Sequence, residues 1–106
     1  MKVSFNPDAE AELQALPTKE RVGILNAYEK LKAEGDQLPF PHSSQVRGAD
    51  RLRELRPRSG RSKWRAFYRR IGTTFVIAAV GPEASDDPVG FRRAVANAEQ
   101  RLERLE

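Results

Sequence analysis

The segment from Thr73 to Val80, TTFVIAAV, places the strongest constraint on the fold of this 106-residue chain. Successive side chains of a strand point to opposite faces, and here both faces are apolar. A strand of this kind is buried on both sides, inside a sheet that is covered from two directions. The segment therefore predicts a central strand, and other parts of the chain must supply the two covering layers.

Three helices are predicted to form those layers. Asn6 and Pro7 start the first helix, because asparagine caps free amide groups and proline fits the first helical position, and Pro17 ends it. The second helix follows directly and closes at Gly35, a typical C-cap. The third spans residues 89–105. We expect the first two to form a helical hairpin over one face of the sheet, with the third helix on the other face or at its edge.

Three more strands are predicted, at residues 2–5, 51–56 and 62–71, from alternation and from turn signals at Pro57, Gly60 and Gly72. Residues 36–50, DQLPFPHSSQVRGAD, are expected to form a long loop. The element order is then β-α-α-β-β-β-α, an α+β fold with a small, mostly antiparallel sheet. At this length, residues 1–106 should form a single domain.

Composition narrows the setting in which the chain acts. It has no cysteine, so disulfides and thiolate metal ligands are excluded. No apolar run approaches the length of a membrane span, and the N-terminus has no apolar signal segment. The sequence therefore predicts a cytoplasmic protein without a membrane partner.

Positive charge is concentrated between Arg47 and Arg70. This stretch holds ten basic residues and two acidic ones, a local net charge of +8, whereas the whole chain carries +4. Aromatic residues are interleaved with the basic ones: Trp64, Phe67 and Tyr68. A basic segment that also carries aromatic side chains is typical of a surface that binds a polyanion, most plausibly nucleic acid.

Alternation sorts the strand at 62–71 into two faces. One face carries Trp64, Ala66 and Tyr68, and the other carries Lys63, Arg65, Phe67 and Arg69. We interpret the first set as facing the core. Trp64 could instead stack on a base, and Tyr68 could act as a phenol in catalysis, but core packing is the simpler interpretation of both.

Candidates for proton transfer are few. His42 is the only histidine and imidazole suits this role, yet its place in a loop favours an ordinary exposed side chain. Glu54 could act as a base, although a cross-strand ion pair with Arg65 or a neighbour is the preferred interpretation. Glu83, Asp86 and Asp87 could suggest a metal site. A solvated turn with charges at a helix N-terminus explains them more simply, so neither a metal nor a cofactor is predicted.

The chain resembles the RelE/HigB superfamily of bacterial toxins, particularly its phage-derived, Gp49-like branch. The resemblance rests on Leu52-Arg53-Glu54-Leu55-Arg56, on Gly60, on Arg65-Ala66-Phe67-Tyr68, on Ala79-Val80-Gly81, and on Pro88 before the last helix. It implies a small ribonuclease of a type II toxin–antitoxin pair. Such toxins cleave messenger RNA, usually at the ribosome, and are silenced by an antitoxin that is commonly a helix-turn-helix protein.

The resemblance also implies roles for individual residues. Arg56 and Arg65 match the residues that hold the scissile phosphate, which suits a guanidinium fork that stays charged. The expected RNA-binding residues are Arg53, Arg58, Arg61, Lys63 and Arg69. Active members often carry an Arg or Lys pair after the last strand, where this chain has the acidic segment 82–87.

That departure leaves two alternatives to a ribonuclease. The same fold could serve as an RNA- or antitoxin-binding module that has lost catalysis. It could also belong to a ParE-like toxin with a target other than RNA, such as gyrase, although the basic cluster with its aromatic residues argues mildly against this.

Overall fold

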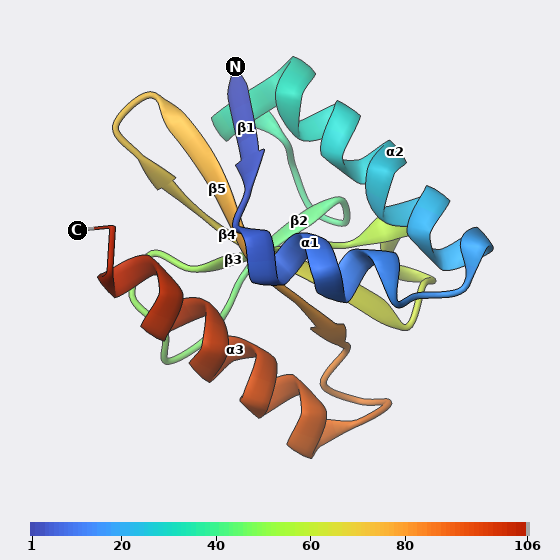
Figure 1. The fold of residues 1–106 in the computed structure, drawn as a ribbon. Coiled ribbons are helices and arrows are strands. Elements are labelled where there is room, and N and C mark those ends of the chain that lie inside the picture. Colours follow the sequence, from blue (N-terminus) through green and yellow to red (C-terminus); the bar gives the residue numbers. More distant parts are fainter. Residues whose placement is uncertain (106) are drawn as a thin grey trace.

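A computed structural model describes residues 1–105 and shows a five-stranded sheet with helices on both faces (Figure 1). The strand order is β1-β5-β4-β3-β2, with β1 parallel to β5 and the other neighbours antiparallel. The strands are β1 (Lys2–Phe5), β2 (Ser43–Gln45), β3 (Arg53–Leu55), β4 (Trp64–Ile71) and β5 (Thr74–Pro82). The helices are α1 (Pro7–Gln14), α2 (Thr18–Glu34) and α3 (Pro88–Glu103), with short 3₁₀ turns η1 (Gly35–Gln37) and η2 (Pro57–Gly60). The predicted α+β class is confirmed.

The helix starts follow from local chemistry. The side chain of Asn6 accepts hydrogen bonds from the amides of Asp8 at 2.8 Å and Ala9 at 3.4 Å, and Pro7 occupies the first position of α1. At α3, the carboxylate of Asp87 accepts from the amide of Gly90 at 2.9 Å, again just before a proline. Both caps satisfy amides that a helix leaves unpaired at its start.

Each face of the sheet has its own core. Side chains from α1, α2 and the sheet form the first core, which includes Leu13, Ile24, Leu31, Tyr68 and Ile77. Side chains from α3, the sheet and the segment before β3 form the second, which includes Leu52, Phe67, Ala79, Ala98 and Leu102. The last helix therefore lies on the face opposite the other two helices, as one of the two predicted placements requires.

Strand β5 is buried on both faces, as its sequence predicts. Phe75 and Ile77 face the first core, whereas Ala79 faces the second. Residues 75, 77 and 79 would all share one face in a regular strand, but a bulge changes the face at Ala79. Phe67 pairs with Ala79 and Tyr68 pairs with Ile77, which leaves Ala78 as the extra residue. The bulge lets two consecutive alanines face α3, so the helix meets a flat surface of small side chains.

The prediction of a single loop over residues 36–50 is wrong. The segment contains η1 and strand β2, which pairs with β3 at the edge of the sheet. Strand β2 carries no apolar alternation because its inward residue is Ser43, which is 1% exposed. Its hydroxyl lies 2.6 Å from that of Tyr68 and accepts from Nε of Arg53 at 3.0 Å. Strand β3 is also shorter than predicted, since residues 51, 52 and 56 lie outside it.

A bridge between α1 and α3 covers the part of β5 that extends past β1, whose pairing ends at Phe5 and Ile77. Glu12 accepts from the amide of Val80 at 3.0 Å and pairs with Arg101 at 2.9 Å. Arg101 also donates to the carbonyl of Ala78 at 2.9 Å. The hydrogen bonds to Glu12 raise the pKa of Arg101, against a smaller opposing effect of burial. The bridge satisfies backbone groups that an open strand edge would leave unpaired.

No helix within residues 1–105 has both the length and the apolar character needed to cross a membrane.

The close approach of α3 to β5 at Gly81 can be tested directly. A Cβ at this position would lie 2.5 Å from the Cβ of Ala94, so Gly81→Ala should lower the free energy of unfolding by about 1–3 kcal/mol. The measurement is urea denaturation. Ala94→Gly in the same chain should recover part of the loss, and a double-mutant cycle isolates the contact. Additive effects of the two substitutions would show that the two residues are not in contact.

Candidate functional site

Four charged side chains meet where strands β3, β4 and β5 end near η2. We call Glu54, Arg56, Arg65 and Glu83 the charge cluster. The carboxylate of Glu54 lies 2.9 Å from Nη1 of Arg56 and 3.5 Å from Nε of Arg65. Arg65 also pairs with Glu83 at 2.8 Å. Glu54 pairs across the sheet with Phe67, so it lies diagonally opposite Arg65, and the predicted cross-strand ion pair is confirmed.

Arg65 is the buried member of the cluster, with its side chain 3% exposed. Its Nη1 donates to the carbonyls of Ser62 at 2.6 Å and Trp64 at 3.0 Å, and its Nη2 donates to that of Gly60 at 3.4 Å. Burial, followed by the nearby Arg56, lowers the pKa of Arg65, while Glu54 and Glu83 act in the opposite direction. The guanidinium stays charged, because arginine does not lose its proton in proteins.

Arg56 is the outer member of the cluster, with its side chain 21% exposed. Its Nε donates to the carbonyl of Pro41 at 3.0 Å, and its guanidinium lies 5.1 Å from the ring centroid of Phe40, which is 70% exposed. Gly60 leaves room for it: a Cβ there would lie 2.7 Å from Nη2 of Arg56. Arg56 and Phe40 together offer a cation and an aromatic face to a ligand.

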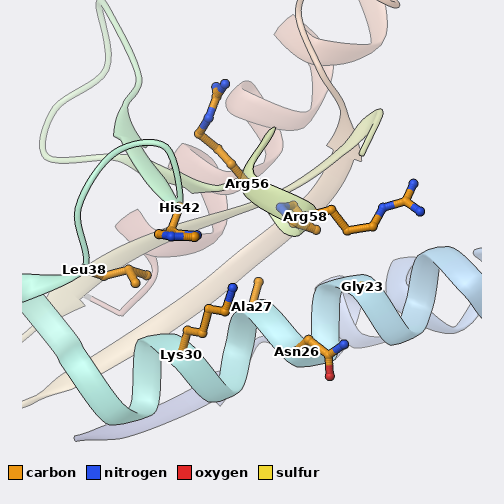
Figure 2. A pocket seen from close by; sticks show the side chains of 9 residues that line it. Gly23, Asn26, Ala27, Lys30, Leu38, His42, Arg56 and Arg58 are labelled. Carbon is orange, nitrogen blue, oxygen red and sulfur yellow. The ribbon is translucent and has the colours of Figure 1, made fainter. Parts of the chain in front are cut away.

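A cleft of about 110 Å³ adjoins the cluster, between α2 and the chain around β2 and η2 (Figure 2). We call it the α2 cleft. Figure 2 shows the ammonium of Lys30 pointing toward the ring of His42, while the guanidinium of Arg56 points away from α2. The lining residues are Gly23, Asn26, Ala27, Lys30, Leu38, His42, Arg56, Pro57 and Arg58. None of them is acidic.

His42 differs from the exposed loop histidine that the sequence favours. It is half-buried and lies just before β2, and its carbonyl accepts a hydrogen bond from the amide of Arg56 at 2.9 Å. This bond extends the pairing of Ser43 with Leu55, so His42 and Arg56 are neighbours across two strands. The sequence prediction contained no strand at β2, and for this reason it placed His42 in a free loop. A free loop would not hold the imidazole at a fixed position beside Arg56.

The predicted RNA-binding residues do not form one surface. Arg58, Arg61 and Lys63 are exposed on the η2 turn and just after it, and Arg58 and Lys63 form ion pairs with Glu20 at 3.4 Å and Asp86 at 3.6 Å. Arg53 and Arg69 lie toward the other end of β4, beside a separate hollow of about 320 Å³. The prediction that the basic face of β4 is a binding surface is wrong in one respect. Arg65 and Arg69 lie on that face, but both are buried.

The η2 turn holds its arginines in an unusual backbone conformation. Arg58 and Ser59 have φ of 54° and 57°, the left-handed region that residues with a Cβ rarely adopt, and Gly60 follows at 90°. Such strain persists only where the surroundings impose it, and it is common at functional sites. The turn separates the guanidinium of Arg58 from that of Arg56, although both residues line the α2 cleft.

The part of the chain that the structure describes contains no group of three or more His, Asp or Glu side chains placed to hold a metal ion. Glu83 pairs with Arg65, Asp86 with Lys63, and Asp87 caps α3. The acidic segment before α3 is thus occupied by ion pairs and a helix cap.

Residues 11–81 match the sequence profile of the family described as phage-derived protein Gp49-like. The chain belongs to this Gp49-like family. A chain in the crystal structure of the toxin–antitoxin complex RelBE2 from Mycobacterium tuberculosis has the same fold. The TM-score is 0.59 at 23% identity, over 77% of this chain and 96% of that chain. No curated protein matches the sequence. The family profile covers both η2 and the lining of the α2 cleft.

The sequence indicates Arg56, Arg65 and Glu54 as candidate site residues but gives no signal for Lys30. Lys30 lies on the polar side of α2, where a lysine looks like any solvated charge. Its place in the cleft depends on how α2 packs against η2, which no local pattern reports. The spacing from Lys30 to His42 crosses η1 and a proline-rich turn, so helical or strand periodicity cannot relate them.

The role of Arg65 in holding the cluster together makes a quantitative prediction. Arg65→Met removes the partner of Glu83 and one of the two partners of Glu54, and it should lower the free energy of unfolding by about 3–5 kcal/mol. Lys63→Met, an exposed neighbour two positions away, should change it by about 0.5 kcal/mol or less. Urea denaturation measures both. Similar small effects of the two substitutions would show that the carboxylates do not depend on Arg65.

Proposed function

We propose that this Gp49-like protein is the toxin of a type II toxin–antitoxin pair and cleaves messenger RNA at the ribosome. The observation that carries the proposal is the Arg56–Glu54 pair, a partly exposed cation held next to a carboxylate that the buried Arg65 also contacts. Family membership and the fold shared with a chain of a toxin–antitoxin complex support it. This function places the protein in the cytoplasm, with mRNA and the ribosome as partners.

The proposed reaction is attack by the 2′-oxygen of RNA on the adjacent phosphorus. A bond forms between the 2′-oxygen and phosphorus, and the bond to the 5′-oxygen breaks, giving a 2′,3′-cyclic phosphate and a 5′-hydroxyl. Glu54 takes the proton from the 2′-hydroxyl, and the leaving 5′-oxygen takes one from solvent. Arg56 stabilises the charge on the phosphorane oxygens, so this route requires no metal ion.

Arg56 fits the role of phosphate ligand because its guanidinium retains donor capacity. Nε and Nη1 are bonded to Pro41 and Glu54, and among the described residues Nη2 has no acceptor. Direct phosphate contact by Arg65 stays a prediction. Its burial and its contacts with Glu54 and Glu83 fit a positioning residue better.

Most of the other basic residues keep their predicted RNA-binding roles as part of this proposal. Arg58, Arg61 and Lys63 are exposed near the cluster, where they can contact neighbouring phosphates. Arg53 would act at the far end of β4, whereas Arg69 is buried there and donates to the carbonyl of Asp50 at 2.7 Å, which fits a positioning role better. We also propose that an antitoxin, expected to be a helix-turn-helix protein, neutralises the toxin by binding it.

Purified protein, ribosomes and a defined mRNA provide the test of this function. The wild type should cleave the mRNA, and Arg56→Gln should reduce the cleavage rate by about 10²–10³-fold, since it removes a donor to the transition state. Arg70→Gln is the matched control, because Arg70 pairs with Asp36 at the other end of β4. Intact mRNA with the wild type, together with normal growth when it is expressed without an antitoxin, would overturn the proposal.

One observation favours a second function, an RNA- or antitoxin-binding module without catalysis. The charge cluster contains two arginines and two glutamates, so it carries no net positive charge. A binding module needs no proton acceptor, whereas the ribonuclease does. A substitution of Glu54 therefore distinguishes the ribonuclease from the binding module.

Glu54→Gln keeps a hydrogen-bond acceptor for Arg56 but removes the proton acceptor. For a ribonuclease, cleavage should fall by about 10²–10⁴-fold, while binding of a 2′-O-methyl RNA, which cannot react, stays equal or becomes tighter. Glu83→Gln removes the same charge away from Arg56 and should have a much smaller effect on cleavage. Equal losses in both variants would contradict proton transfer by Glu54 and point to the charge of the cluster instead.

A further inference from the structure

Among the described residues, the α2 cleft contains one cation without a carboxylate partner, Lys30, whereas Arg56 and Arg58 in its lining pair with Glu54 and Glu20. Lys30 and His42 face each other there, and Arg58 and Arg56 complete the lining (Figure 2). Within residues 1–105, Lys30 forms no ion pair, whereas Lys32 on the same helix pairs with Glu29 at 3.7 Å. A concave site lined by one sign of charge attracts the opposite charge from solution.

The size of the α2 cleft restricts the ligand. Its volume of about 110 Å³ is far below the roughly 300–1,000 Å³ of typical small-molecule pockets. The ammonium of Lys30 and an imidazole N–H of His42, which face each other in the cleft, are donors that suit the oxygens of a phosphate. The lining therefore fits one small oxyanion, and it offers no flat apolar slot for a base.

Gly23 keeps the floor of the cleft open. It lies within α2, where glycine lowers helix stability relative to alanine. A Cβ at Gly23 would lie 3.5 Å from the Cβ of Pro57, an ordinary contact that the fold accommodates. Packing therefore does not require glycine at this position, and a methyl group there would occupy part of the cleft.

We propose that the α2 cleft binds a phosphate group of the RNA backbone next to the phosphate at Arg56. This inference rests on the proposed function. RNA is favoured over an acidic protein segment because the cleft and the charge cluster adjoin at Arg56. A single strand held at the guanidinium of Arg56 carries its neighbouring phosphates toward Arg58 and Lys30. Lys30 and His42 are thus substrate-binding residues that lie outside the basic stretch.

The single histidine provides a direct reporter. In NMR titrations, the imidazole C2–H signal of His42 should shift in a saturable way on addition of inorganic phosphate, and again with a short 2′-O-methyl RNA. Lys30→Gln should weaken both responses, and Lys32→Gln should leave both unchanged. No saturable shift with phosphate overturns the anion site. A shift with phosphate but none with RNA overturns the proposal that the bound phosphate belongs to the RNA backbone.

Salt dependence gives a second, independent measurement. Binding of the same RNA, followed by fluorescence anisotropy, should lose about 0.7 from the slope of log K against log salt in Lys30→Gln, as expected for one phosphate contact, with roughly three- to tenfold weaker affinity. Gly23→Ala should also weaken binding while the protein unfolds at the same or a higher temperature. Equal slopes for Lys30→Gln and Lys32→Gln overturn the inference.

The proposed function can fail separately from this inference. The wild type could leave mRNA intact and still show the phosphate- and RNA-dependent shifts of His42. That result would support the α2 cleft as an RNA site in a protein that does not cleave RNA. If the wild type cleaves RNA but the signal of His42 does not shift, the ribonuclease function is supported and the α2 cleft is not part of the RNA-binding site.

Discussion

The buried guanidinium of Arg65 determines how the functional end of this fold is arranged. It connects β3 through Glu54, the segment after β5 through Glu83, and the η2 turn through the carbonyls of Gly60 and Ser62. Backbone hydrogen bonds also join these segments, such as that from the amide of Glu83 to the carbonyl of Lys63 at 2.8 Å, and Arg65 adds a charged link among all three. A buried cation is tolerated only when its charge and its donors are satisfied, and here the satisfying groups are the ends of those segments.

The burial of Arg65 depends in turn on small residues far along the chain. Arg65 pairs across the sheet with Gly81, and Gly81 lies directly under Ala94 of α3. A Cβ at position 81 would lie 2.5 Å from the Cβ of Ala94, so a larger residue there requires α3 or β5 to shift. The bulge at Ala78 supplies the same close fit further along β5. Packing on the second face therefore sets the electrostatic environment of the site, and the helix that provides it contributes no side chain to the charge cluster.

Much of this arrangement could be predicted from local patterns, and the exceptions have physical causes. The apolar run of β5 predicted two covering layers, and Asn6 with Pro7 predicted the start of α1. Alternation placed Arg65 on the same face as Phe67, which is buried, so the burial of Arg65 had a signal that its charge obscured. Strand β2 had no such signal in the sequence, because its inward residue is the polar Ser43. The hydroxyl of Ser43 is satisfied by Tyr68 and Arg53. Hydroxyl pairs of this kind form through tertiary contacts, which periodicity does not report.

Charge on this molecule is divided between a neutral cluster and a cleft that holds Lys30, and this division bears on the proposed catalysis. At the cluster, an incoming phosphate meets Arg56 already paired with Glu54, so ground-state attraction there is weak. In the proposed binding mode, a phosphate in the α2 cleft meets Lys30 and His42, and no acidic residue lines that cleft. Binding energy gained in the cleft can hold RNA in place, while the cluster interacts most strongly with the extra negative charge of the phosphorane. An enzyme gains rate only from interactions that strengthen in the transition state, and this separation favours them.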